Sequence, residues 1–382
     1  MPTDLWTDFV AARADGRTGR REQIGRMAAE LACQKTRSGG TDHAAADDQH
    51  RHLQGVPNRI AGMLRFYSAD EVHSALAFPR LVSRLEQAFT RGASVPLRHV
   101  HALDESDLLL LMPAWRAAGA SNGDTGALGI KLVTVFPRAA QLGAATVNAL
   151  YVLLDRTTGR PRALLDGEAL TLRRTAAASA LAARLMARSD SRTLLVIGTG
   201  KLAPFLLRAH CAVRPELERV LLWGRSAQRA AELVQQFGAA GLSVEVAHDL
   251  AQAVRGADIV SCATTATEPL VQGNWVAPGT HLDLVGGFTR AMREADDEAV
   301  ARARIAVDTY AGALAEAGDL LVPLERGVIT REQVVAELAE LVRGERVGRS
   351  DAAQITLFKS VGTALEDLAA AELVVETTES VD

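Results

Sequence analysis

Residues 193–203 constrain the fold most, because they read as a buried strand that enters a glycine turn and then a helix. Gly198 permits the tight turn, Gly200 lets the backbone approach a pyrophosphate, and Ala203 lets the helix pack close to the strand. With Thr199 between the glycines, the helix N-terminus offers N–H groups and a positive dipole to the phosphates. Taken alone, this GxGxxA pattern is equally well explained as an ordinary strand–helix turn.

The segments that follow favour dinucleotide binding. A second apolar strand at residues 220–223 ends in Gly224, a third at residues 258–263 ends at Thr264, and a fourth ends at Gly286. Strands alternating with helices in this way form a doubly wound sheet, which binds its ligand at the carboxyl ends of the strands. We therefore expect a nicotinamide dinucleotide at the glycine turn, Thr264 and Gly286.

The end of the second strand indicates which cofactor is preferred. Enzymes that use NAD usually place an acid there, where it binds the ribose 2′-hydroxyl. This chain has Arg225 and Ser226 instead, with Arg229 one turn further on. No acid is present to repel a 2′-phosphate, so we predict that NADPH is preferred and that NADH binds more weakly.

Composition excludes several other classes of protein. The 382 residues suffice for two domains, and a net charge of −4 with a pI of about 6.2 argues against nucleic acid or an anionic membrane surface as partner. No apolar run approaches the roughly 20 residues of a membrane span. Cys33, Cys211 and Cys262 are widely separated and show neither metal-ligand spacing nor a disulfide framework, so we expect no metal and a cytoplasmic location.

Residues 1–62 differ in composition from the rest of the chain. They carry Gly, Ser, Asp and His clusters, and only residues 22–31 suggest a helix. Such a segment buries too little apolar surface to offset chain entropy, so we expect it to be largely disordered. It is either a regulatory tail or a non-native extension upstream of a natural start at Met63. We expect the second, because folded-domain patterning begins at Met63.

The remaining pattern predicts an α/β protein with two domains. Ser68 and Glu71 form a capping box that begins a helix reaching about Thr90. We predict a Rossmann dinucleotide-binding domain at residues 189–324, and an α+β substrate-binding and dimerisation domain at residues 63–188 and 325–382. Further strands are predicted at residues 63–67, 106–113, 126–136, 146–155 and 162–165, and helices at 170–188, 330–343 and 354–373.

Several basic residues could hold an anionic substrate. Lys131 ends a strand in Gly129-Ile-Lys131, although an exposed edge lysine is the commoner explanation of such a position. Arg173 and Arg174 open a helix, where they either face solvent or bind a carboxylate that offsets their conflict with the helix dipole. Arg98 lies on a loop or strand, where it can equally be an ordinary surface residue.

Taken together and in order, these segments resemble the ornithine cyclodeaminase/mu-crystallin family from Met63 to the C-terminus. The segments that carry the resemblance are Gly129-Ile-Lys131, Thr158-Gly-Arg-Pro-Arg-Ala-Leu-Leu-Asp-Gly, Leu170-Thr-Leu-Arg-Arg-Thr-Ala-Ala, Ile197-Gly-Thr-Gly, Asp283-Leu-Val-Gly-Gly, Glu316-Ala-Gly-Asp-Leu and Thr356-Leu-Phe-Lys-Ser-Val-Gly-Thr-Ala-Leu-Glu-Asp.

This resemblance implies roles for individual residues. Lys131 matches the family's active-site lysine, Arg174 matches the arginine that grips the substrate carboxylate, and Arg98 is a second carboxylate ligand by a looser match. It also implies that the chain forms a homodimer through its substrate domain.

One position departs from the true ornithine cyclodeaminases, which place an aspartate directly after the Val-Gly-Gly strand. Phe288 stands there and can neither accept a proton nor pair with the ammonium of ornithine. The surrounding segment looks like that of the Δ1-pyrroline-2-carboxylate and Δ1-piperideine-2-carboxylate reductases of the family, in which Phe288 would line the pocket for the ring. We expect reduction of such a cyclic imine to L-proline or L-pipecolate.

The resemblance leaves other activities open. An alanine dehydrogenase-like or opine-type reduction, residual ornithine cyclodeaminase activity, and a non-catalytic NADPH-binding protein like the crystallins are the alternatives. The residues do not decide which ring size is preferred, because one methylene is worth only about 1–3 kcal/mol of discrimination. Nor do they decide whether Lys131 or solvent supplies the proton to the ring nitrogen.

Overall fold

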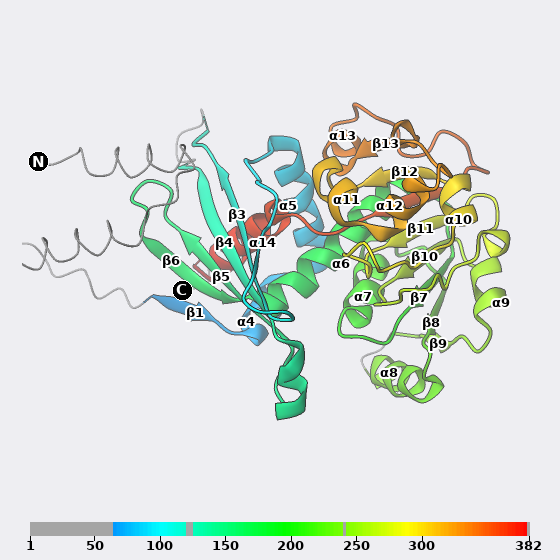
Figure 1. The fold of residues 1–382 in the computed structure, drawn as a ribbon, viewed down its shortest axis with the longest axis horizontal. Helices are drawn as coiled ribbons and strands as arrows, with labels where there is room; N and C mark the ends of the chain where they lie inside the picture. Colours follow the sequence, from blue (N-terminus) through cyan, green and yellow to red (C-terminus); the bar gives the residue numbers. More distant parts are fainter. Residues whose placement is uncertain (1–63, 120–124, 240–241, 380–382) are drawn as a thin grey trace, which may run out of the picture. The chain divides into compact units, whose positions relative to one another are not determined.

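The computed structural model describes residues 64–119, 125–239 and 242–379 (Figure 1). Within them the chain forms two β-sheets with their helices, which confirms the predicted α/β class with a Rossmann part and an α+β part. The predictions for residues 1–62, Met63 and Cys33 lie outside the described residues. Among the described helices, none is both long and apolar enough to cross a membrane.

The first sheet has six strands in the order β1-β6-β5-β4-β3-β2 and is antiparallel except for the β1–β6 pair. Its strands are β1 (Arg65–Tyr67), β2 (His99–Ala102), β3 (Leu108–Arg116), β4 (Ala127–Val135), β5 (Val147–Leu154) and β6 (Pro161–Asp166), with the 3-10 helix η2 (Pro137–Leu142) between β4 and β5.

Side chains alternate between the two faces of this sheet, as the pleat of a strand requires. The face that includes Met112, Lys131 and Tyr151 is buried and lies against helices. The opposite face is also apolar but only partly buried. It consists of Phe66, Leu109, Leu111, Pro113, Trp115, Leu128, Ile130, Leu132, Leu150, Val152, Leu154 and Leu164, which we call the outer apolar face.

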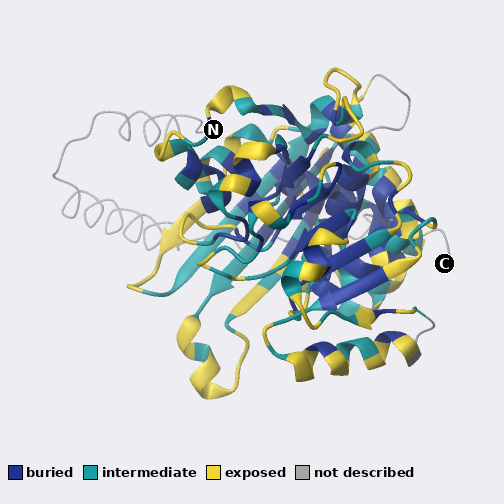
Figure 2. Cartoon of the chain, turned by 90° about the vertical axis from the view of Figure 1, so that its right-hand side faces the viewer, coloured by how far each residue is buried: buried dark blue, intermediate teal, exposed yellow. Residues whose placement is uncertain are grey.

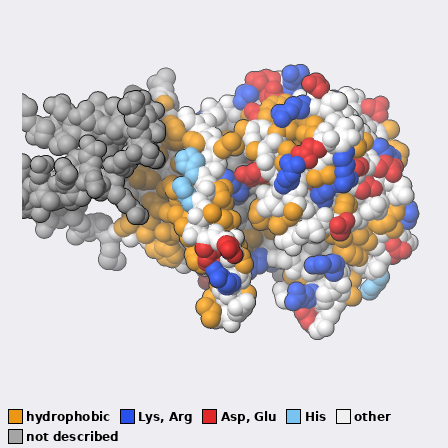
Figure 3. All heavy atoms as spheres, in the orientation of Figure 1, with side chains coloured by type: hydrophobic (Ala, Val, Ile, Leu, Met, Phe, Trp, Pro, Cys, Tyr) orange, Lys and Arg blue, Asp and Glu red, His pale blue; other side chains and the backbone are white. Residues whose placement is uncertain are grey.

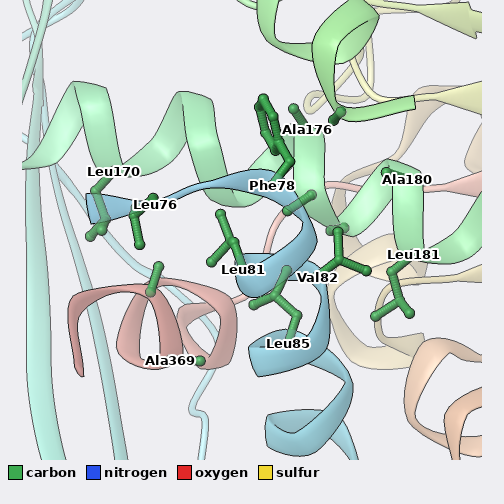
Figure 4. Packing of buried hydrophobic residues seen from close by; sticks show 14 of the residues in the cluster. Leu76, Phe78, Leu81, Val82, Leu85, Leu170, Ala176, Ala180, Leu181 and Ala369 are labelled. Carbon is green, nitrogen blue, oxygen red and sulfur yellow. The ribbon is translucent and has the colours of Figure 1, made fainter. Parts of the chain in front are cut away.

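Helices α4 (Ala69–Ala75), α6 (Gly167–Met186) and α14 (Ala364–Glu379) lie against the buried face, and α5 (Phe78–Arg91) packs on α6 and α14. Figure 4 shows Leu81, Val82 and Leu85 of α5 pointing toward Leu181 of α6 and Ala369 of α14. The alanines of α6 are almost all fully buried, because small side chains let this helix contact strands of both sheets.

The second sheet has eight parallel strands in the order β13-β12-β14-β11-β10-β7-β8-β9. The strands are β7 (Thr193–Ile197), β8 (Arg219–Trp223), β9 (Glu245–Val246), β10 (Ile259–Cys262), β11 (His281–Leu284), β12 (Arg304–Val307), β13 (Val334–Glu337) and β14 (Thr356–Lys359). The helices are α7 (Ala203–Val213), α8 (Ala227–Ala239), α9 (Leu250–Arg255), α10 (Asp297–Arg302), α11 (Tyr310–Glu316), α12 (Gly318–Glu325) and α13 (Leu338–Val342), with the 3-10 helices η3 (Gly273–Trp275) and η4 (Arg331–Gln333).

Figure 2 shows that the strands of this second sheet are mostly buried and that exposed residues lie on the helices and loops around them. The strand order reverses between β7 and β10, since the chain continues to β8 on one side and returns to β10 on the other. A crevice at such a switch point is where a doubly wound sheet binds its ligand.

The predicted helix from Ser68 to Thr90 is interrupted. Its capping box forms as expected, with Glu71 N–H donating to Ser68 Oγ (3.4 Å) and Ser68 N–H donating to Glu71 (2.8 Å). The chain then breaks between α4 and α5, because Pro79 has no N–H and its ring is tolerated only in the first turn of a helix.

The two predicted C-terminal helices were partly wrong. Residues 330–343 form η4, β13 and the short α13, and residues 354–363 include β14 before α14 begins. Thr356 to Phe358 are buried on both sides by β11 and β12, and Gly362 turns the chain with a φ of 85°. The predicted division into domains stays a proposal. It assigned all of residues 325–382 to the substrate domain, but β13 and β14 of this segment pair in the second sheet. Only α14 packs on the first sheet.

Candidate functional site

The glycine turn lies at the carboxyl end of β7, next to the switch point. Gly198 has a φ of 125°, which only glycine adopts without strain, and its N–H donates to Trp223 O (2.8 Å). A side chain on Gly198 would overlap the Ala263 carbonyl, whereas one on Gly200 would meet no described atom. Packing therefore explains Gly198, and the open space at Gly200 fits a ligand that approaches the backbone. Ala203 begins α7 and is fully buried.

The end of β8 lies beside this turn. A side chain on Gly224 would overlap Thr199, so glycine lets the two loops touch. Ser226 caps α8, since its hydroxyl accepts the Arg229 N–H (3.3 Å). Arg225 and Arg229 are exposed, and neither forms an ion pair with a residue that the structure describes. Both guanidinium groups are therefore available to an anion.

Thr264 and Gly286 follow the neighbouring strands β10 and β11. A side chain on Gly286 would overlap the Thr264 backbone, so the two strand ends are in direct contact. The fully buried carboxylate of Glu294, for which sequence reasoning predicted no role, accepts hydrogen bonds from both.

The predicted substrate residues Lys131 and Arg174 meet at one carboxylate. Asp367, in the first turn of α14, receives hydrogen bonds from Lys131 Nζ (2.9 Å) and from Arg174 Nε (2.9 Å). Arg174 Nη1 also donates to Glu366 (2.6 Å), and Lys131 Nζ to the Thr171 hydroxyl (3.3 Å). All four charged groups are buried.

Burial and pairing shift the protonation of this cluster. Burial lowers the pKa of Lys131 to about 8, although Asp367 favours its charged form. Burial opposes ionisation of Asp367, but Arg174 and Lys131 outweigh it and lower the pKa of Asp367. Burial raises the pKa of Glu366 to about 7 despite Arg174. Because burial disfavours the ionised form of Glu366, this carboxyl offsets the charge of Arg174 less than Asp367 does.

Arg98 reaches the same region from the loop before β2. Its Nε lies 3.0 Å from Glu316 Oε1 at the end of α11, and its Nη2 donates to Val361 O (2.8 Å). A side chain on the next residue, Gly362, would overlap the guanidinium of Arg174. Residues 361 and 362 therefore lie between the two arginines.

The buried carboxylate of Asp308 holds this segment in place. It accepts the N–H groups of Val361 (2.8 Å) and Gly362 (2.6 Å) and the Ser360 hydroxyl (3.2 Å). Asp308 directly follows β12, at the same edge of the sheet as the glycine turn. The sheet edge that carries the glycine turn is therefore connected to the basic cluster through Asp308.

Each arginine keeps one nitrogen for a ligand. Nη2 of Arg174 and Nη1 of Arg98 form no hydrogen bond with the residues that the structure describes. Phe288, the third predicted substrate residue, is 46% exposed and follows β11 at the carboxyl edge of the sheet.

Two local expectations about these residues were wrong. Lys131 is only 3% exposed and lies in the middle of β4, so it neither ends the strand nor is an exposed edge lysine. The helix begins at Gly167, capped by Asp166, so Arg174 lies in its second turn, where the helix dipole has little effect. The anions that stabilise Arg174 are Asp367 and Glu366. Arg173 is half-buried and donates to His73 (3.3 Å) and to Leu76 O (3.2 Å).

Tyr151 explains the glycine of Gly129-Ile-Lys131. It pairs with Lys131 across β4 and β5, and a side chain on Gly129 would overlap its hydroxyl. Sequence reasoning assigned no role to Tyr151, Asp308, Glu294, Glu366 or Asp367. The adjacent acids that open α14 were the one usable signal, because charged residues at the start of an apolar helix need partners.

Known proteins resemble this chain over most of its length. The model of the ornithine cyclodeaminase/mu-crystallin family matches residues 64–382. The Δ1-pyrroline-2-carboxylate reductase of Colwellia psychrerythraea is 38% identical over 321 residues, covering 82% of this chain and 99% of that protein.

Two solved structures share the fold. A Δ1-pyrroline-2-carboxylate reductase from Thermococcus litoralis, in complex with NADH and L-proline, is 34% identical with a TM-score of 0.77, covering 83% of this chain and 98% of that one. An archaeal alanine dehydrogenase dimer with bound NAD is 30% identical with a TM-score of 0.76, covering 83% and 97%.

The fold, with its glycine turn at the switch point, and the relatives define a nicotinamide-dependent oxidoreductase. The chain belongs to the ornithine cyclodeaminase/mu-crystallin family.

Proposed function

We propose that this chain reduces the C=N bond of Δ1-pyrroline-2-carboxylate to give L-proline, with Δ1-piperideine-2-carboxylate, which gives L-pipecolate, as a second substrate. The observation that carries the proposal is the convergence of Lys131, Arg174 and Arg98, with free arginine nitrogens, beside the crevice of a dinucleotide fold. The relatives named for this reductase support it.

In this proposal each residue has a stated task. Arg174 and Arg98 bind the substrate carboxylate through Nη2 and Nη1, and Asp367 holds Arg174 and Lys131 in position. The exposed ring of Phe288 contacts the apolar edge of the imine ring. When bound, the reduced nicotinamide supplies the hydride, which is added to C2 while the ring nitrogen gains a proton from Lys131 or solvent.

Ornithine is disfavoured as substrate, because Phe288 cannot pair with its side-chain ammonium and the nearby acid Asp319 already has a partner. Asp319 lies next to Gly287, the residue before Phe288, and is fully buried. Its Oδ2 accepts a hydrogen bond from Lys359 Nζ (2.9 Å). It is therefore not free to pair with an ornithine ammonium.

The test follows reduced cofactor oxidation with each cyclic imine, and with pyruvate plus ammonia, in parallel. We expect turnover of the cyclic imines. Turnover of pyruvate with ammonia, without turnover of the cyclic imines, would instead favour an alanine dehydrogenase-like activity. This alternative is tested because the archaeal alanine dehydrogenase has a similar fold. Cofactor binding without turnover of any of them would favour a non-catalytic binding protein.

We further propose that NADPH is preferred to NADH, supported by the unpaired, exposed Arg225 and Arg229 beside Ser226. Arg225→Ala should raise the KM for NADPH by about tenfold or more and leave that for NADH nearly unchanged, since a hydrogen-bonded charge pair is worth about 1.5–3 kcal/mol. Arg219→Ala is the matched control, because Arg219 begins the same strand at its other end and pairs with Glu245 (3.0 Å). Equal losses with both cofactors would contradict the assignment.

The pKa of Lys131 gives a pH prediction. Its ammonium is present below a pKa of about 8 and is lost above it, so the attraction for the substrate carboxylate decreases as pH rises. We expect kcat/KM for the imine to decline above about pH 8, because kcat/KM reports the ionisation of the free enzyme. Lys131→Arg should move that decline to higher pH. If the decline of kcat/KM in Lys131→Arg stayed at the same pH, the titrating group would be the imine substrate and not Lys131.

We also propose a homodimer that buries the outer apolar face of the first sheet. Figure 3 shows hydrophobic side chains gathered on this part of the molecule, and Phe66 on the face is 52% exposed. A contiguous apolar surface of this kind favours a partner surface of the same kind. For location we retain the cytoplasm, supported by the free thiols of Cys211 and Cys262.

A further inference from the structure

Three charged residues form a fully buried cluster below the cofactor crevice. Glu294 lies between β11 and α10, Asp319 in the first turn of α12, and Lys359 at the end of β14. Lys359 Nζ donates to Asp319 Oδ2 (2.9 Å), and Asp319 Oδ1 accepts the N–H groups of Glu294 (2.7 Å) and Ala295 (3.2 Å). Asp319 and Lys359 belong to segments that carry the family resemblance, yet neither has a place in the proposed chemistry.

The carboxylate of Glu294 joins the ends of two strands. Its Oε1 accepts the N–H (2.7 Å) and the hydroxyl (2.8 Å) of Thr264, after β10. Its Oε2 accepts the N–H groups of Gly286 (2.8 Å) and Gly287 (3.3 Å), after β11. Four donors around one fully buried carboxyl group favour a single arrangement of these loop positions, because no water reaches the Glu294 oxygens to replace a lost donor.

The position of these strand ends indicates which half of a dinucleotide they face. The glycine turn after β7 is the pyrophosphate site and the end of β8 is the adenosine ribose site. β10 lies on the other side of β7 from β8. The rim formed by Thr264, Gly286 and Gly287 is therefore on the nicotinamide side of the crevice.

From this geometry we infer that Glu294 is a positioning residue for the nicotinamide half of the cofactor, acting through Thr264, Gly286 and Gly287. Asp319 and Lys359 in turn hold Glu294. The inference rests on the proposed function, since it requires that the crevice binds a nicotinamide dinucleotide. It also means that the N–H groups of this rim are already used and do not bind phosphate.

The cluster also connects the rim to the substrate residues. Lys359 is followed within three residues by Val361 and Gly362, which contact Arg98 and Arg174. A shift of the rim would therefore change the position of the nicotinamide relative to the bound imine, on which the rate of hydride transfer depends.

The experiment uses Glu294→Gln in the full chain. The amide replaces one oxygen acceptor with a donor, so the variant cannot accept hydrogen bonds from both strand ends. The first ligand is whichever of NADH and NADPH the wild type binds more tightly. The second is the matching fragment that lacks nicotinamide, which is ADP-ribose for NADH and its 2′-phosphate for NADPH. The measured quantity is the dissociation constant of each. We expect the intact cofactor to bind about tenfold or more weakly and the fragment to bind as in the wild type.

The matched control is Asp283→Asn, at a buried carboxylate of β11 that accepts the Ser261 hydroxyl (2.6 Å) and does not touch the rim. This variant should lower the unfolding midpoint without changing the ratio of the two dissociation constants. In turnover, Glu294→Gln should lower kcat as well as raise the cofactor KM.

The outcomes separate this inference from the proposed function. Equal weakening of intact cofactor and fragment in Glu294→Gln, or no weakening of either, would overturn the positioning role. Failure of the wild type to bind any nicotinamide dinucleotide would overturn the proposed function itself. Cofactor binding with the expected selective loss, but without imine turnover, would keep the positioning role and reject only the substrate.

Discussion

Replacing Arg174 with methionine is expected to lower kcat/KM for Δ1-pyrroline-2-carboxylate by about two to three orders of magnitude and to destabilise the folded chain by about 3–5 kcal/mol. The two effects have different causes. Catalysis loses a guanidinium that is proposed to bind the substrate carboxylate. Stability falls because Asp367 and Glu366, both fully buried, lose the cation that they share.

Two further variants separate these causes. Arg174→Lys keeps a cation beside Asp367 but loses the planar fork, so it should recover more stability than activity. Arg173→Met changes the neighbouring residue, which contacts His73 and the ring of Phe78 instead of the carboxylates. It should reduce stability moderately and leave kcat/KM close to that of the wild type. The measurements are steady-state kinetics and denaturant unfolding of all three variants.

One result would contradict the assignment. If folded Arg174→Met kept the kcat/KM of the Arg173 variant, the buried Arg174 would have only a structural role. The carboxylate would then have to be bound by Arg98 or Lys131 alone.

A second substitution with a large expected effect is Ile130→Lys, which should convert the proposed dimer into a monomer. Ile130 lies at the centre of the outer apolar face, opposite Val152 on β5 and Pro113 on β3. In a symmetric dimer the charge would be buried twice, at a cost of about 2 kcal/mol or more per copy, so the dissociation constant should rise about a thousandfold. Mass in solution by light scattering should fall from twice the chain mass of 40.6 kDa to one.

Thr134→Lys is the matched control. It lies on the same strand and the same face, between Leu109 and Asn148, at the margin of the outer apolar face. It should remain dimeric. Wild-type protein that is monomeric at micromolar concentration, or a folded Ile130→Lys variant that stays dimeric, would contradict the proposal that this face is the dimer interface.

The parts of the site that sequence could predict depend on local geometry. Gly198, Gly200 and Ala203 serve one strand, one turn and one helix, so their spacing carries the signal without knowledge of the rest of the fold. The capping box of Ser68 and Glu71 was predictable for the same reason. Pro79 also indicates that a new helix begins near it, because proline is tolerated only in the first turn of a helix, and this predicts the break between α4 and α5.

Other features required the tertiary structure. In β4, Leu128, Ile130 and Leu132 alternate with Ala127, Gly129 and Lys131, so the pattern alone favours burial of the leucine and isoleucine face and exposure of the face that carries Lys131. Contact with α14 buries the face that carries Lys131, and the strand pattern alone could not predict that contact. β14 is a run of four residues buried by its neighbours on both sides, and such a run has no period that distinguishes a strand from a helix.

The amino-acid sequence by itself predicted the dinucleotide fold, because a glycine turn and alternating strands and helices are encoded in short segments. The family resemblance, carried by other short segments, predicted the basic residues of the candidate site. Only the tertiary structure decided what those residues contact. Asp367 is 236 positions from Lys131 and 193 from Arg174, and Glu294 joins Thr264 to Gly286 through a carboxylate that lies outside both strands. A buried charge is stable only with its partners, and chain packing brings those partners together from distant segments.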